Sequence, residues 1–161
     1  MAGGTGVRFW PVSRAAKPKQ FLDVVGTGKT FIQNTYERFL KVVPKENILI
    51  VTGERYRDIV MEQLPELESR NLLLEPYARN TAPCIAYATY TLLKRDPEAR
   101  MVVTPSDHMI ENEELFVETI CNAFESIEEK DVLMTLGVLP TRPDTNYGYV
   151  QAYGGSDVYK S

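Results

Sequence analysis

The sequence predicts an α/β fold with three layers, doubly wound around a mostly parallel sheet. Short aliphatic runs alternate with longer amphipathic segments along the 161 residues. The aliphatic runs are apolar on both faces, which is typical of parallel strands that helices cover on both sides. Strand–helix alternation of this kind favours right-handed crossovers between neighbouring strands. Because no internal repeat or linker interrupts the pattern, we expect one domain over residues 1–161.

The predicted strands are short runs rich in Ile, Leu, Val and Met. They lie at 48–52, 71–74, 101–104 and 132–136, and a further candidate follows at 149–153. Four segments between them place apolar residues at helical spacing. These predicted helices cover about 30–43, 54–64, 81–95 and 113–130. The first begins with a capping box formed by Thr30 and Gln33.

Both ends of the sequence suggest that the chain continues. A glycine-rich loop at residues 2–6 opens the chain, and such loops normally follow a strand that points them at a ligand. Only Met1 precedes this loop, and a polar tail follows the last candidate strand. We therefore expect a domain truncated at both ends.

Composition excludes several classes of function. The chain is 43% hydrophobic and 25% charged with a net charge of −4, and its acids and bases are interspersed. Nucleic-acid binding needs a concentrated basic face, so the charge pattern argues against it. No apolar stretch approaches the roughly 20 residues of a membrane-spanning helix. Cys84 and Cys121 fall in predicted helices without metal or redox spacing, so we expect buried free thiols and a cytoplasmic location.

The opening loop has the composition of a polyphosphate site. Adjacent glycines at Gly3 and Gly4 let backbone N–H groups approach phosphate oxygens closely. Cationic side chains follow within one short stretch, namely Arg8, Arg14, Lys17 and Lys19. Amide donors and positive charge together suit nucleoside-triphosphate chemistry. A short glycine motif alone is more often an ordinary surface loop, and this one lacks the full dinucleotide-binding fingerprint.

A second glycine pair, at 26–30, imitates the end of a P-loop. That motif requires a glycine where this chain has Asp23, and no strong strand precedes the segment. We predict an ordinary turn, with Thr30 used as a helix cap.

Four sequence blocks together carry a family resemblance. They are 2–14 followed by 18–22, then 75–83, then 105–108, then 137–149. In this order and spacing they resemble the mannose-1-phosphate guanylyltransferases (GDP-mannose pyrophosphorylases) of the sugar-phosphate nucleotidyltransferase family. The Trp10-Pro11 pair and the segment 18–21 separate this pattern from thymidylyl- and uridylyltransferases. The resemblance spans almost the whole chain and implies a Rossmann-like nucleotidyltransferase domain.

The resemblance implies transfer of GMP from GTP to mannose 1-phosphate with Mg²⁺ as cofactor, giving GDP-mannose and pyrophosphate. The implied partners are GTP and mannose 1-phosphate, without nucleic acid or membrane, and a homodimer of the full-length enzyme is compatible with it. Members carry a lysine for the sugar phosphate and a second metal-binding aspartate in a C-terminal part without counterpart here, so we expect residues 1–161 alone to be inactive. The alternatives are a nucleotidyltransferase for another sugar 1-phosphate or nucleotide, and a non-catalytic nucleotide-binding fragment.

The resemblance also assigns site residues by position. Arg8 would stabilise the departing pyrophosphate, and Lys19 would sit beside the α-phosphate. The nucleotide would contact Ala2, Gly3, Gly4, Thr5, Gly6, Glu75, Asn80, Thr81, Pro105 and Ser106. Among these, Glu75 and Asn80 would form the guanosine pocket.

Three further assignments concern the metal and the sugar. Asp107 would bind Mg²⁺, a cation that prefers carboxylate and phosphate oxygens. The mannose would meet Tyr147, Gly148 and Tyr149, although the chain has Asn146 where the pattern has glycine. His108, the single histidine, is expected to be structural or to support the neighbouring metal ligand, because an attacking phosphate is already an anion and needs no general base.

Overall fold

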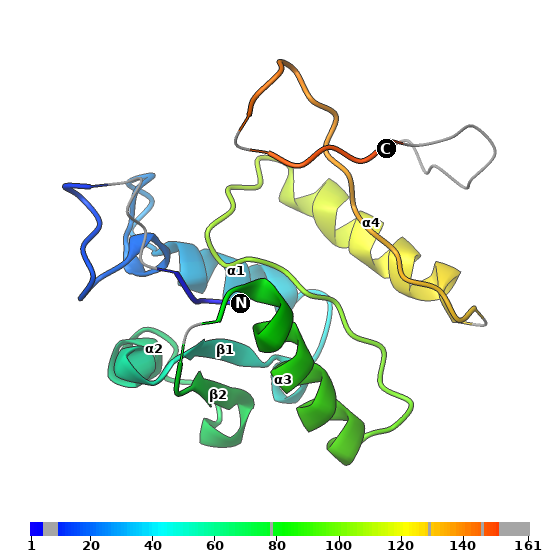
Figure 1. The fold of residues 1–161 in the computed structure, drawn as a ribbon, viewed down its shortest axis with the longest axis horizontal. Helices are drawn as coiled ribbons and strands as arrows, with labels where there is room; N and C mark the ends of the chain where they lie inside the picture. The colour runs from blue at the N-terminus through cyan, green and yellow to red at the C-terminus, as the bar shows by residue number, and fades with distance from the viewer. Residues whose placement is uncertain (5–9, 78, 129, 146, 152–161) are drawn as a thin grey trace.

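The computed structural model describes residues 1–4, 10–77, 79–128, 130–145 and 147–151. Its sheet consists of two parallel strands, β1 (Ile50–Gly53) and β2 (Leu72–Glu75), joined through helix α2 (Arg57–Gln63). Figure 1 shows the two strands side by side near the N-terminus. Both strands therefore end at the same edge of the sheet, with Gly53 paired with Glu75.

Three further helices surround this unit. They are α1 (Phe31–Phe39), α3 (Thr81–Arg95) and α4 (Glu113–Ser126). Short 3₁₀ turns lie between the longer elements, at η2 (Lys19–Phe21), η3 (Lys45–Asn47), η4 (Glu54–Tyr56) and η5 (Ser69–Asn71). All four predicted helices are confirmed, and the predicted capping box at the start of α1 is present, with the Thr30 N–H donating to Gln33 Oε1 at 2.9 Å.

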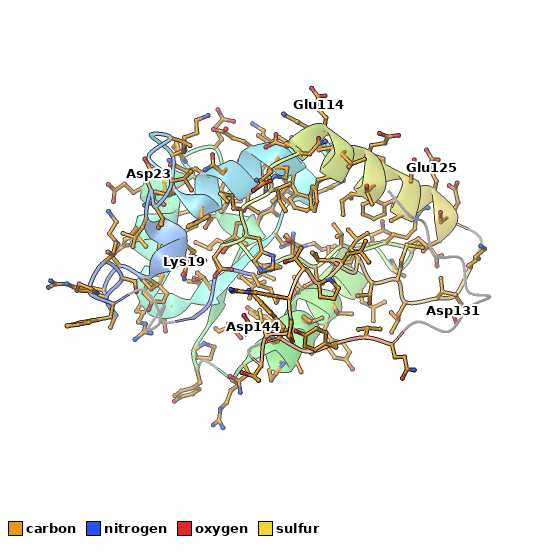
Figure 2. All side chains as sticks on the ribbon, turned by 90° about the horizontal axis from the view of Figure 1, so that it is seen from above. Lys19, Asp23, Glu114, Glu125, Asp131 and Asp144 are labelled. Carbon is orange, nitrogen blue, oxygen red and sulfur yellow. The ribbon has the colours of Figure 1, made fainter. Side chains whose placement is uncertain are left out.

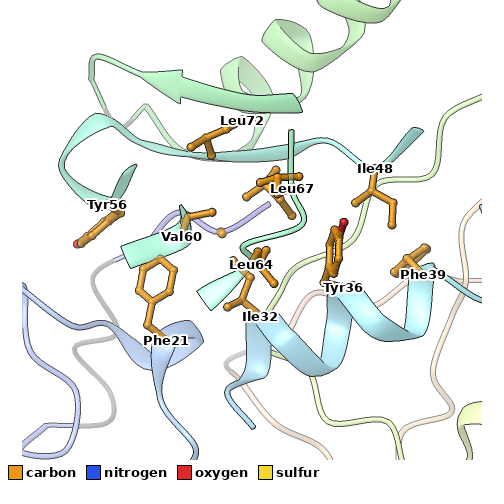
Figure 3. Close-up of a cluster of buried hydrophobic side chains, with 12 residues drawn as sticks. Phe21, Ile32, Tyr36, Phe39, Ile48, Tyr56, Val60, Leu64, Leu67 and Leu72 are labelled. Atoms are coloured by element: carbon orange, nitrogen blue, oxygen red, sulfur yellow. The ribbon is translucent and has the colours of Figure 1, made fainter. Parts of the chain in front are cut away.

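Alternating residues of the strands face two different helical layers. Ile50 and its register partner Leu72 belong to a core that α1 and α2 complete. The next pair, Val51 and Leu73, packs instead against α3. Figure 3 shows the first core between β1 and α1. Helices cover both faces of the parallel sheet, which confirms the three-layer α/β class.

Helix α4 extends the α1 side of the molecule. The rings of Phe39 and Phe116 meet edge to face with centroids 6.0 Å apart, and Glu113 lies within ion-pair distance of Arg38 and Lys41. Figure 2 shows Glu114 and Glu125 pointing outward from α4. The helix therefore has the amphipathic arrangement that its sequence predicts.

Two predicted strands do not form in the described residues. Segments 101–104 and 132–136 have no strand assignment, and Leu133 is fully exposed. An apolar run becomes a strand only where a neighbouring backbone completes its hydrogen-bond ladder. In the described part of the chain, 132–136 has no backbone hydrogen bond to a neighbour, and 101–104 has only the α-amino group of Met1. The 149–153 prediction is wrong for 149–151, whereas 152 and 153 lie outside the described residues.

Residues 1 and 2 link the sheet to the segment after 101–104. Ala2 N donates to Val51 O at 2.8 Å, Met1 N donates to Thr104 O at 2.8 Å, and Ser106 N donates to Met1 O at 3.0 Å. The start of the chain thus lies between β1 and residues 104–106. This position brings the glycine loop and Asp107 to the edge where β1 and β2 end.

Among the helices of the described ranges, none is both long enough and apolar enough to cross a bilayer.

Candidate functional site

The glycine loop begins at a buried residue, Ala2. Ala2 is 1% exposed, and its carbonyl oxygen accepts two side-chain hydrogen bonds, from Thr52 Oγ1 and Gln20 Nε2, both at 2.9 Å. Gln20 Nε2 also reaches Gly4 O at 3.4 Å. Gly4 has φ of +118°, a backbone conformation that favours glycine. Buried hydrogen bonds therefore fix the first peptide of the loop.

Glu75 lies beside the loop. It is the last residue of β2, and its Oε2 would be 3.8 Å from a Cβ built on Gly3. The backbone of Gly3 and the carboxylate of Glu75 therefore face each other at the end of the sheet. Ligands of open α/β sheets bind at this edge, outside the carboxyl ends of the strands.

The turn η2 carries two polar side chains into the site. Lys19 and Gln20 are adjacent within it, and Phe21 anchors it in the core with no exposed surface. The Phe21 ring lies 5.5 Å from the ring of Tyr56, and Gln63 Nε2 donates to Phe21 O at 3.2 Å. The contacts of Phe21 with Tyr56 and Gln63 therefore hold the turn on its core side, while Lys19 and Gln20 point into the site.

Lys19 reaches the segment that follows 101–104. Its Nζ donates to Asp107 O at 3.1 Å and lies 3.7 Å from Asp107 Oδ2. The same ammonium stands 4.9 Å from the centroid of the Phe31 ring. Because the Lys19 side chain is 20% exposed, its charge is only partly solvated, which strengthens its interaction with anions in the site.

Residues 105–108 are held from two sides. Besides its bond to Met1, Ser106 accepts a hydrogen bond at its carbonyl oxygen from Thr35 Oγ1 at 3.5 Å. Ser106 is 4% exposed, and the neighbouring Asp107 side chain is 42% exposed. His108 is also exposed. The chain here has a buried anchor followed by an accessible carboxylate.

The donor set fits a magnesium ion that substrate phosphates help to hold. Mg²⁺ is commonly bound by one or two carboxylates together with phosphate oxygens, rather than by a cage of protein ligands. The accessible carboxylate of Asp107 can supply one such ligand. Within the described residues no group of three or more His, Cys, Asp or Glu side chains could hold a metal by itself.

Helix α3 starts at the same edge of the sheet. Asn80 precedes its first residue, Thr81, and has φ of 65°, which is uncommon outside glycine. Both residues are exposed and follow Glu75 by only a few positions. The free N–H groups of a helix start are suited to bind anions and polar ligand atoms. Of these three residues, Glu75 has a described approach to the loop, and Asn80 and Thr81 follow it at the start of α3.

Some predicted site residues are not brought to this cluster by described contacts. Tyr147 and Tyr149 form a turn of their own, in which Tyr147 N donates to Asp144 O at 3.4 Å and Tyr149 OH donates to it at 3.1 Å. Both tyrosines and Gly148 are exposed. Thr5, Gly6 and Arg8 lie outside the described residues.

Two of the predicted cations lie in a separate turn. Arg14 and Lys17 exchange backbone hydrogen bonds at 2.9 and 3.2 Å, and both side chains are exposed. Of the cations at positions 14, 17 and 19, only Lys19 has a described contact with Asp107.

The second glycine pair forms a turn, as predicted. Asp23 Oδ1 accepts hydrogen bonds from Gly26 N at 2.8 Å and Thr27 N at 3.1 Å, and Asp23 Oδ2 accepts one from Gly28 N at 2.7 Å. The amides that a phosphate loop would offer to a ligand are therefore used by a carboxylate of the chain itself.

Sequence reasoning missed two residues of the site, Gln20 and Thr52. In the sequence, Gln20 is only part of a motif and Thr52 only part of a predicted strand, yet they are 4% and 0% exposed. The available signal for Thr52 is a polar side chain at the end of an apolar run, whereas Gln20 directly follows Lys19 and gives no such signal. A polar side chain needs a hydrogen-bond partner when it is buried, and here the partner is the loop.

Comparison of the sequence with known proteins identifies the family of this chain. A family model described as Nucleotidyl transferase matches residues 1–160. Mannose-1-phosphate guanylyltransferase 2 of Escherichia coli O157:H7 is 41% identical over 155 residues, which are 94% of this chain and 32% of that protein. Mannose-1-phosphate guanylyltransferase RfbM of Salmonella typhimurium is 39% identical over 165 residues, which are 99% of this chain and 34% of that protein. The chain thus spans about a third of the length of these relatives.

A solved structure agrees with the sequence comparison. The crystal structure of mannose-1-phosphate geranyltransferase from Thermus thermophilus superimposes with a TM-score of 0.71 at 35% sequence identity. The match covers 80% of this chain and 37% of that one. The glycine loop at the sheet edge, the parallel unit beneath it and a family match over nearly every residue lead to one assignment: the chain belongs to the nucleotidyl transferase family.

Proposed function

We propose that the protein transfers GMP from GTP to mannose 1-phosphate, giving GDP-mannose and pyrophosphate. The observation that carries the proposal is the meeting of a glycine loop, Glu75, Lys19 and Asp107 at one edge of the sheet. The relatives named above, which are called mannose-1-phosphate guanylyltransferases, support the choice of nucleotide and sugar.

The reaction requires no covalent intermediate with the protein. A phosphate oxygen of mannose 1-phosphate attacks the α-phosphorus of GTP, the bond from that phosphorus to the bridging oxygen breaks, and pyrophosphate leaves. The attacking oxygen is already anionic, so no general base is required. The chain therefore contributes alignment of the reactants and neutralisation of their charge.

Phosphate binding falls to the loop and to Lys19. The N–H groups of Gly3 and Gly4 donate to phosphate oxygens, and Lys19 places positive charge between the loop and Asp107. Arg8 balances charge on the leaving pyrophosphate. Asp107 holds Mg²⁺, which neutralises phosphate charge when it is bound. The proposal also assigns nucleotide contacts to Ala2, Thr81, Pro105 and Ser106, and by sequence to Thr5 and Gly6.

The base and the sugar bind on either side of the phosphates. The Glu75 carboxylate accepts hydrogen bonds from the guanine N1–H and amino group, with Asn80 beside it. Thymine offers no such pair of donors, so this contact favours guanine. Tyr147, Gly148 and Tyr149 contact the mannose.

A panel of substrates tests the proposal. The full-length protein is assayed with Mg²⁺ against GTP, ATP, UTP and dTTP, each combined with mannose 1-phosphate or glucose 1-phosphate, and pyrophosphate release is measured. The proposal expects the highest kcat/KM for GTP with mannose 1-phosphate. A higher value for another pair would replace that substrate assignment, and no turnover with any pair would contradict the proposed activity.

A further inference from the structure

The carbonyl oxygen of Ala2 is the meeting point of two buried side chains from distant parts of the chain. Gln20 lies in η2 and Thr52 in β1, and both place a donor 2.9 Å from this oxygen. Their exposed fractions of 4% and 0% show that water does not compete for these bonds. Gln20 also bonds to the Gly4 carbonyl at 3.4 Å, so one carboxamide contacts two carbonyl groups of the loop.

The geometry of the peptide bond gives these contacts a consequence for ligand binding. The Ala2 carbonyl and the Gly3 N–H belong to one planar trans peptide, in which they point in opposite directions. Fixing the oxygen toward Gln20 and Thr52 therefore aims the Gly3 N–H away from them. Within the described part of the chain, no protein acceptor receives this N–H.

Glycine makes such a fixation necessary. Gly3 and Gly4 lack a Cβ and can adopt many backbone conformations, so an unrestrained loop would present its amides in many directions. A donor that is already oriented needs no ordering when the ligand binds, and this increases affinity.

We propose that Gln20 and Thr52 are positioning residues that fix the Ala2 carbonyl and thereby orient the loop amides toward the nucleotide phosphates. This inference rests on the proposed function insofar as it requires a nucleotide on the loop. It assigns the two side chains to the protein's own carbonyl groups, so neither needs to touch substrate.

Isosteric substitutions separate positioning from packing. Thr52→Val keeps the shape of the side chain and removes the hydroxyl, whereas Thr52→Ser keeps the hydroxyl. Gln20→Met keeps the length and removes the donor. In the full-length protein we expect Thr52→Val and Gln20→Met each to raise the KM for GTP roughly two- to twelvefold, the range of one lost hydrogen bond. The KM for mannose 1-phosphate should stay unchanged, and Thr52→Ser should restore the wild-type KM for GTP.

The double variant gives a sharper readout. In each single variant the remaining donor still holds the Ala2 oxygen, whereas in Gln20→Met/Thr52→Val nothing does. The KM for GTP should therefore rise by more than the product of the two single effects, because both residues act on one atom. Independent, multiplicative effects would show that the two side chains do not act on the loop together.

Asn71 offers a matched control at the other end of the sheet. Its buried carboxamide also donates to two backbone carbonyls, Glu46 O at 2.8 Å and Lys45 O at 3.4 Å. Asn71→Leu should lower the Tm while leaving the KM for GTP unchanged. If Asn71→Leu raised that KM as much as Gln20→Met, or if the Gln20 and Thr52 variants lowered only the Tm, the positioning role would be refuted.

A measurement without turnover separates this inference from the proposed function. Hydrogen exchange of the peptide that contains residues 1–4 should accelerate in Thr52→Val and stay at the wild-type rate in Thr52→Ser. If the wild-type protein does not use GTP with mannose 1-phosphate, the proposed function fails, and the KM test moves to whichever nucleotide the protein uses. Unchanged exchange in Thr52→Val and in Gln20→Met would overturn the positioning role whatever the substrate.

Discussion

The ammonium nitrogen of Lys19 lies 3.7 Å from Oδ2 of Asp107, a residue 88 positions further along the chain. Lys19 comes from a 3₁₀ turn anchored in the core, and Asp107 from the segment held by Met1. The pair therefore links η2 to the segment that contains Asp107, on two sides of the candidate site.

Replacing the Asp107 carboxylate should lower activity and raise the Mg²⁺ concentration that the protein needs. Asp107→Asn removes a charged oxygen ligand, so we expect kcat to fall by at least about a hundredfold and half-maximal activity to need more Mg²⁺. His108→Ala should cost much less, because the exposed imidazole has no assigned step. Magnesium titrations of both variants, with circular dichroism to check folding, measure this. A larger loss in His108→Ala would reverse the two assignments.

Glu75 should read the base. Glu75→Gln removes the charge that accepts from the guanine N1–H and amino group, a loss of about 1–3 kcal/mol for GTP. The kcat/KM for ATP and dTTP should change far less. Equal losses for all three nucleotides would show that Glu75 does not contact the base.

The turn closed by Asp23 should stabilise the fold without taking part in nucleotide binding. Desolvation acts to raise the pKa of Asp23, but hydrogen bonds from the N–H groups of Gly28, Thr27, Gly26 and Val25 together hold that pKa below its ordinary value. The lowered folded-state pKa means that the carboxylate stabilises the fold above its unfolded pKa, near 4, and that this contribution disappears as the pH falls through the folded pKa.

Thermal unfolding of Asp23→Ala over a pH series measures this contribution. The difference in Tm from wild type should be largest at neutral pH and shrink below about pH 4. Lys29→Ala, which removes the P-loop-like cation from the same turn, should leave the KM for GTP unchanged. A large increase in that KM would mean that this turn binds phosphate after all.

The two cysteines should differ in reactivity. Cys84 is 5% exposed and packs against Val51 and Leu73, and burial together with the charge of Glu75 raises the pKa of its thiol. Cys121 is partly exposed. An aromatic disulfide reagent at pH 8 should modify one thiol quickly and the second only on unfolding, and Cys121→Ser should remove the fast phase. A fast phase that persists in Cys121→Ser would show that the Cys84 environment is open.

The helices could be predicted because their signals are local. Helix α3 runs from Thr81 to Arg95 as expected, and α1 begins after the predicted cap at Thr30. Apolar periodicity and capping require only neighbours in the sequence. Strands are harder to predict, because a strand also needs a partner: 50–53 and 72–75 have each other, whereas 132–136 has no described backbone neighbour.

The residues of the candidate site could be predicted from sequence motifs, but the contacts that hold these residues in place could not. Gly3, Lys19, Glu75 and Asp107 each stand in a recognisable block, and the structure places them at one sheet edge. The contacts that hold them were not predictable, because a hydrogen bond from Thr52 to Ala2 joins residues 50 positions apart. Spacing along the sequence does not encode such a contact.

The central claim is that the α-phosphorus of GTP moves to mannose 1-phosphate. The most direct measurement uses GTP labelled at the α-phosphorus, mannose 1-phosphate, Mg²⁺ and the full-length protein, with the products separated chromatographically. We predict that the label appears in GDP-mannose while pyrophosphate stays unlabelled, and that Asp107→Asn greatly slows its appearance. Label that remains in GTP under conditions in which the protein is folded, or that is released as GMP without GDP-mannose, would contradict the claim.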